Sequence, residues 1–272
     1  MIRRNPLPWF FLLAFLISWA GMVPLTLYGR GLLSFTSPLF NIIGGLGPAF
    51  AAMIIVMALK GGEGLKELFR PFLLGRVGIQ WYLVAFFGMA VLAGAALVLL
   101  FRFNGVIPDW MRFGPWFMVL PVFLVNLLSN VWEEIAWRGF ALPRLQARFS
   151  ALAASLILGI LWAVWHFPLL LNPKNPMSGY PWHMMVINIS AMSIIYAWLY
   201  NNTRGSLLLA TLFHAASNTV AFILVAALSS EAFALHYQYL TWVIVDAAIV
   251  IALAYGANSL SRQADAPVII RD

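Results

Sequence analysis

The sequence contains no cysteine and few charged residues. Of its 272 residues, 9% are charged, 63% are hydrophobic and 15% are aromatic. The lack of cysteine excludes disulfide bonds, thiolate metal ligands, a cysteine nucleophile and lipid attachment through cysteine. Soluble domains have about 25% charged residues, so this composition cannot cover a surface that faces water. A soluble globular enzyme and a disordered chain are therefore both excluded.

Negative charge is scarcer than positive charge. The chain has 9 Asp and Glu residues against 16 Lys and Arg residues, which gives a formal net charge of +7. The basic residues are scattered through short gaps between apolar stretches and form no continuous patch, which is typical of anchors at a membrane surface. We expect the lipid bilayer to be a partner and nucleic acid not to be one.

Long hydrophobic runs dominate the rest of the sequence. A helix needs about 20 apolar residues to cross a hydrocarbon core, and the alternating pattern of a membrane β-barrel is absent. The sequence therefore predicts an all-α, polytopic membrane helical bundle, with residues 1–272 forming a single transmembrane domain. About eight membrane-spanning segments are expected, near residues 8–28, 37–59, 79–101, 115–141, 151–171, 182–200, 205–228 and 238–256.

Most Lys and Arg residues fall in alternate connections, on the side that would hold both termini. The longest polar connection, residues 60–78, carries Lys60, Lys66, Arg70 and Arg76. Because cytoplasmic loops carry an excess of Lys and Arg, both termini are predicted to be cytoplasmic. The short loops suggest an integral protein of a bacterial plasma membrane.

The fourth segment carries polar residues at helical spacing. Asn126, Asn130, Glu134 and Arg138 recur every four residues and would form one stripe along a helix, with Glu134 and Arg138 as an ion pair. Glu133 is rotated by about 100° from Glu134 and is left as the unpaired acid, which suits a general base or acid. The alternative is that both acids belong to a packing network.

Two further segments carry histidine. His166 follows Trp162 by four residues, and a lone histidine among aromatic residues is a weak signal. His214 and Asn218 lie one turn apart and offer adjacent hydrogen-bond donors, which could hold an oxyanion or join two helices. The rise per residue places all three positions and Glu133 at similar depth.

These groups suit hydrolysis of a peptide bond. Glu133 with His166 would orient and deprotonate a water, while His214 and Asn218 would stabilise the tetrahedral oxyanion. Glu133, His166 and His214 are also of the residue types that bind a divalent metal such as zinc. The sequence contains no His-Glu-x-x-His motif, which would favour a metal-dependent mechanism. We favour metal-free chemistry because Glu133 already supplies a base.

The polar residues form three ordered motifs on separate hydrophobic segments. They read Glu133-Glu134-x-x-x-Arg138, Trp162-x-x-x-His166 and His214-x-x-x-Asn218, within about residues 126–218. This set resembles the signature of the CAAX protease and bacteriocin-processing family, also called the Abi family. These intramembrane endopeptidases are often labelled metalloproteases. The second motif of the family usually begins with Phe, and here position 162 is Trp.

The resemblance implies specific roles for these residues. Glu133 and His166 would activate water, His214 and Asn218 would stabilise the oxyanion, and Glu134 and Arg138 would support the site. It also implies hydrolysis of a membrane-associated peptide or of a protein C-terminus, as by type II CAAX prenyl proteases, with or without a prenyl group on the substrate.

Two other functions remain open at this point. The same buried Glu and His residues could serve a proton- or cation-coupled transporter, or could hold together a non-catalytic membrane scaffold. Asp246 in the last segment is expected to be a third buried acid, paired with an interior Arg or Asn. His236 is expected at a membrane interface.

Overall fold

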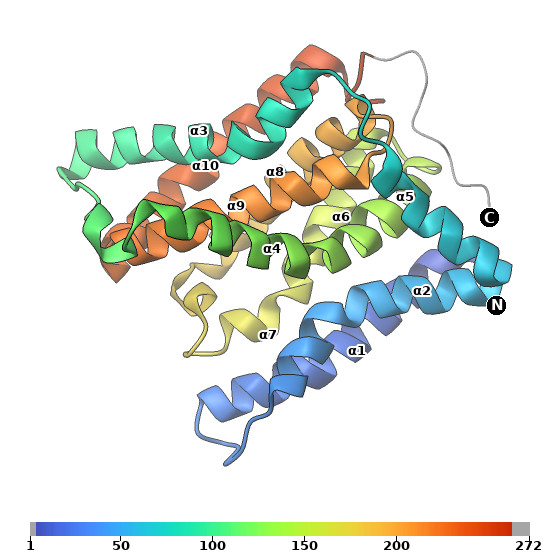
Figure 1. The fold of residues 1–272 in the computed structure, drawn as a ribbon, viewed down its shortest axis with the longest axis horizontal. Helices are drawn as coiled ribbons and strands as arrows, with labels where there is room; N and C mark the ends of the chain where they lie inside the picture. The colour runs from blue at the N-terminus through green and yellow to red at the C-terminus, as the bar shows by residue number, and fades with distance from the viewer. Residues whose placement is uncertain (1–3, 263–272) are drawn as a thin grey trace.

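The structure, a computed structural model, describes residues 4–262 and consists there of helices joined by turns and loops (Figure 1). This arrangement confirms the predicted polytopic helical bundle. The α-helices are α1 (Pro6–Gly29), α2 (Pro38–Phe69), α3 (Ile79–Asn104), α4 (Val119–Glu134), α5 (Leu142–Gln146), α6 (Ala151–Trp165), α7 (Phe167–Leu170), α8 (Trp182–Asn202), α9 (Leu207–Ala227) and α10 (Ser230–Tyr255).

Seven helical segments of the described chain are long and apolar enough to cross a membrane. The remaining predicted segment, the fifth (residues 151–171), is shorter, because α6 has only 15 residues and ends at Trp165. Pro168 follows at the start of α7, and proline removes the backbone N–H that a continuous helix would use. The break places His166 at the junction of the two helices.

The first and last described helices meet the same end of the bundle. Phe10 near the start of α1 lies 4.7 Å from Phe140, measured between ring centroids. Beyond α10, the backbone carbonyls of Ser259 and Leu260 accept hydrogen bonds from Asn201 and Asn202 at the end of α8. Residues 1–3 and 263–272 lie outside the described residues, so the cytoplasmic placement of both termini stays a prediction.

Glycines allow the helices around the centre of the bundle to approach closely. A Cβ atom on Gly47 of α2 would collide with Ser18 of α1, and one on Gly159 of α6 would lie 2.6 Å from the Cα of Ser190 in α8. Such small residues let backbones pack in membranes, where van der Waals contact replaces the hydrophobic effect between helices.

A π-helix, η5 (Ile135–Ala141), continues α4 directly after the two glutamates. All seven of its residues are buried, including Trp137, Arg138 and Phe140. A π-helix inserts an extra residue into a turn, and such insertions are frequent at functional sites. The η5 turn therefore carries Trp137 and Arg138 into the interior alongside Glu133 and Glu134.

The orientation of the bundle can be tested with introduced cysteines, because the natural chain has none. The predicted orientation puts Gly62 on the cytoplasmic side and Gly179 on the opposite side, and a Cβ added at either meets no atom within 4 Å. In intact cells, a membrane-impermeant maleimide should label Gly179→Cys, and should label Gly62→Cys only after the membrane is opened. The unsubstituted chain is the control, and the reverse labelling pattern would contradict the predicted orientation.

Candidate active site

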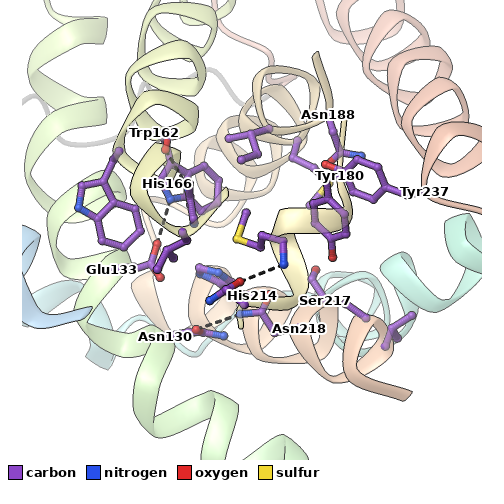
Figure 2. A pocket seen from close by; sticks show the side chains of 18 of the residues that line it. Asn130, Glu133, Trp162, His166, Tyr180, Asn188, His214, Ser217, Asn218 and Tyr237 are labelled. Carbon is purple, nitrogen blue, oxygen red and sulfur yellow. Dashed lines mark hydrogen bonds between the residues drawn. The ribbon is translucent and has the colours of Figure 1, made fainter. Parts of the chain in front are cut away.

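A cavity of about 500 Å³ lies in the middle of the bundle. Its walls come from α1, α2, α3, α4 and α6 to α10, together with the connection before α8. Glu133, His166, His214 and Asn218 all line this cavity, and Figure 2 shows them around a common space. The structure thus brings together the four residues that the sequence motifs placed on three separate segments.

The polar stripe of α4 faces α9 along most of its length. The amide of Asn126 donates to Thr219 Oγ1 at 3.2 Å, and the amide of Asn218 donates to Asn130 Oδ1 at 3.1 Å. The third contact joins Glu134 of α4 to His214 of α9. Three successive side-chain contacts therefore fix the register of α4 against α9, in addition to apolar packing. We call these contacts the α4–α9 ladder.

Glu134 is held by two partners. Its Oε1 atom lies 2.8 Å from Arg138 Nη1 and 2.8 Å from His214 Nδ1. Both Glu134 and Arg138 are fully buried, so the ion pair suggested by their spacing is present and is shielded from water. The guanidinium of Arg138 also lies 3.7 Å from the ring centre of Tyr196 and 4.3 Å from that of Trp162. These cation–π contacts add to the stabilisation of a buried cation.

Glu133 has a different environment, as its lack of an ion-pair partner at helical spacing suggested. Within the described chain it forms no salt bridge to Lys or Arg, and its Oε2 atom accepts hydrogen bonds from two indole groups. Trp162 Nε1 donates at 2.9 Å and Trp137 Nε1 donates at 3.2 Å. The other carboxylate oxygen, Oε1, makes no hydrogen bond to any described residue. It is therefore the oxygen left for a ligand in the cavity.

His166 lies at the break between α6 and α7. Its Nδ1 atom lies 2.8 Å from the backbone carbonyl of Trp162, which can only accept a hydrogen bond. Nδ1 therefore carries a proton, and the neutral ring presents the lone pair of Nε2. Because His166 and Glu133 line the same cavity, a basic nitrogen and a carboxylate oxygen are both available there.

The predicted metal ligands do not assemble in this geometry. Among residues 4–262, no group of three or more His, Asp or Glu side chains comes together in a way that could hold a metal ion. Glu133, His166 and His214 share the cavity without forming such a group. The residues present therefore do not fit the zinc site that their chemical types suggested.

The far end of the cavity contains residues that the sequence motifs did not indicate. Tyr180 and Tyr237 stack with ring centres 4.0 Å apart and an interplanar angle of 12°, and Figure 2 shows them side by side. Burial raises the pKa of Tyr180 to about 12, so its hydroxyl stays protonated at neutral pH and can donate a hydrogen bond. Both tyrosines lie outside the three motifs, so motif spacing could not have identified them.

His236 also belongs to this end of the cavity, and its expected interfacial position is wrong. The side chain is buried, and its Nε2 atom lies 3.1 Å from the carbonyl oxygen of Ala93 in α3. The prediction placed the residue at the edge of a segment beginning at residue 238, whereas α10 begins at Ser230. The longer helix draws His236 into the bundle.

The expected burial of Asp246 is wrong as well. Asp246 is exposed on α10 and makes no hydrogen bond or ion pair with any residue that the structure describes. Ile244 and Ala248 of the same helix are buried. Two residues correspond to about 200° of rotation, so Asp246 faces away from the side that packs against the bundle.

Comparison with known proteins agrees with the fold and the cavity. The family model of the type II CAAX prenyl endopeptidase Rce1-like proteins matches residues 114–220, which include all three motifs. CAAX prenyl protease 2 of the archaeon Methanococcus maripaludis is 30% identical over 186 residues, covering 65% of this chain and 69% of the relative. Both comparisons thus match this chain, a membrane bundle with a polar cavity, to a family of membrane proteases. The chain belongs to the CAAX protease and bacteriocin-processing family, and it is an integral membrane protein.

The buried ion pair predicts a specific effect on stability. Glu134→Gln leaves Arg138 as an uncompensated buried cation, which should lower the free energy of unfolding by about 3–5 kcal/mol. Unfolding in mixed detergent micelles, followed by tryptophan fluorescence, measures this loss. Glu63→Gln is the matched control, because Glu63 pairs with Lys66 on the exposed surface. Equal stability of the two variants would contradict the expected contribution of the buried pair.

Proposed function

We propose that this protein is an intramembrane endopeptidase of the CAAX type, which hydrolyses a peptide bond of a membrane-associated peptide or protein C-terminus. One observation carries the proposal. Glu133, which has no Lys or Arg partner among residues 4–262, shares a cavity with the available Nε2 of His166 and with the side chains of His214 and Asn218. The family of the chain supports the same activity.

Glu133 and His166 would act on a water molecule in the cavity. One of these two bases accepts a proton from the water as its oxygen attacks the peptide carbonyl carbon. The C–N bond then breaks, and the same proton is delivered to the departing amine. Atoms and charge therefore balance without a covalent enzyme intermediate.

His214 and Asn218 would stabilise the negative oxygen that forms during this attack. Nδ1 of His214 is bonded to Glu134, which leaves Nε2 as the nitrogen that would donate a hydrogen bond to this oxygen. Asn218 uses one N–H for Asn130 and retains the other. Two donors on adjacent turns of α9 can thus point at one oxyanion.

The substrate would be largely apolar. The cavity is bounded by side chains such as Met22, Leu25, Met192 and Leu240 together with its few polar groups, and about 500 Å³ accommodates a short peptide segment. A prenyl group on the substrate is supported by the name of the archaeal relative. The proposed location is the plasma membrane of the cell.

Cleavage of defined peptides by the purified protein in lipid tests the proposal. The peptide library should include prenylated and unprenylated C-terminal peptides. Wild-type protein should cleave a member of the library, whereas Glu133→Gln and His166→Ala should each lower kcat by about 10²- to 10⁴-fold, the usual contribution of a general base. Glu63→Gln, an exposed change of the same kind, should retain wild-type activity.

Two further measurements accompany this assay. A chelator should leave cleavage unchanged if the reaction uses only the residues named above, and loss of cleavage that zinc restores would establish a metal requirement. Persistent cleavage by Glu133→Gln would contradict the proposed base. Ion flux that depends on Glu133, without cleavage of any peptide, would favour transport instead.

A further inference from the structure

The far end of the cavity carries polar groups that the proposed mechanism does not use. Tyr180, Tyr237 and Asn188 line the cavity, and Figure 2 shows them on the side opposite Glu133. Tyr237 and Asn188 are each only 8% exposed. Neither tyrosine hydroxyl forms a hydrogen bond to any residue that the structure describes, and neither is fully enclosed by protein atoms. Both hydroxyls are therefore available to a ligand.

The orientation of the Asn188 amide follows from a chain of hydrogen bonds. Thr241 Oγ1 donates its single proton to the backbone carbonyl of Tyr237, at 2.7 Å. It can therefore only accept from Asn188, whose Nδ2 atom lies 3.1 Å away. This leaves Asn188 Oδ1 as an acceptor without a hydrogen-bond partner among residues 4–262. The same chain holds Asn188 close to Tyr237, which stacks on Tyr180.

We propose that Tyr180, Tyr237 and Asn188 form a subsite for a peptide amide group of the substrate, away from the bond that is cleaved. A peptide amide has one N–H donor and one C=O acceptor. A tyrosine hydroxyl can donate to the carbonyl oxygen, and Asn188 Oδ1 can accept from the N–H. This inference rests on the proposed function and names the part of the substrate that the far end of the cavity holds.

The surroundings of the subsite favour a neutral group over a terminal carboxylate. In the described part of the chain, no Lys or Arg lines the cavity. His236 offers no atom to a ligand, because Nε2 lies against the carbonyl of Ala93 and Nδ1 is fully enclosed. A buried carboxylate needs a cationic partner, whereas an amide needs only one donor and one acceptor. The neighbouring Phe233 and Leu240 supply apolar walls for substrate side chains.

Removal of single hydroxyl groups tests the two donors. Tyr180→Phe and Tyr237→Phe keep the stacked rings and remove one hydroxyl each. Each should raise the KM for a cleaved peptide by about 3- to 10-fold, the usual effect of one neutral hydrogen bond. The kcat should stay within about twofold of wild type, because the subsite does not contact the reacting atoms.

Tyr239→Phe is the matched control. Tyr239 lies two residues after Tyr237 on α10, which places it on the other side of the helix. Its hydroxyl donates to Asn104 Oδ1 at 3.0 Å, outside the cavity. This variant loses the same chemical group without touching the subsite, so its KM and kcat should equal those of wild type.

Ester analogues of the cleaved peptide test the acceptor. An ester has no N–H and so removes the group that Asn188 would bind. In a series with one ester at a time, replacement of one bond other than the cleaved bond should raise the KM of wild type by about 3- to 10-fold. The same ester should cause no further loss in Asn188→Ala, because its partner is already missing. The Tyr→Phe variants keep the Asn188–Thr241 bond and remain decisive if Asn188→Ala does not fold.

Binding of a capped peptide measures the subsite without turnover. The probe is a fluorescent acetyl-trileucine methylamide, with the corresponding free acid for comparison, followed by fluorescence anisotropy with protein in micelles. Wild type should bind the methylamide saturably, and the Tyr→Phe variants should bind it about 3- to 10-fold more weakly. Such binding without cleavage of any peptide would contradict the proposed function and still support the subsite.

Absence of saturable binding, or equal binding by wild type and both Tyr→Phe variants, would overturn the inference. Tighter binding of the free acid that depends on the two hydroxyls would also overturn it, since the occupant would then be a carboxylate. Weaker binding in both variants but not in Tyr239→Phe supports it. A loss confined to one of the two supports it as well and identifies that tyrosine as the donor.

Discussion

The buried pair of Glu134 and Arg138 is the constraint on which the rest of the site depends. Two opposite charges inside a membrane bundle need close partners, because the loss of hydration is costly. Arg138 therefore requires Glu134 beside it and the aromatic faces of Trp162 and Tyr196 around it. Glu134 in turn holds His214. Through these contacts, one ion pair joins the segments that carry all three motifs.

Much of the fold could be predicted from the length of the hydrophobic runs alone. Each long apolar run became a helix because backbone groups in lipid must be paired within the segment. The exceptions arise from local chemistry. Pro168 ends the fifth segment early, and the π-helix Ile135–Ala141 has no spacing rule that would reveal it in advance. Asp246 shows that an acid in a spanning helix need not face the interior.

The sequence predicted those parts of the candidate site that depend on interactions within one helix. The four-residue spacing indicated the Glu134–Arg138 pair and left Glu133 without a cationic partner, as the structure shows. Contacts between helices were beyond that reasoning. The indole donor Trp162 reaches Glu133 from another segment, and the stack of Tyr180 on Tyr237 joins residues far apart in the chain. Such contacts depend on how helices pack, which no single motif encodes.

The short α6 also affects the bilayer around the protein. Its 15 residues span about 22 Å, less than the hydrocarbon thickness of about 30 Å. Hydrophobic mismatch of this kind draws the headgroup region inward on the side of the shorter helix. Since α6 ends beside His166, thinning of the bilayer along this helix would bring hydrated headgroups toward the cavity. The same break that positions the imidazole would then shorten the path by which water reaches it.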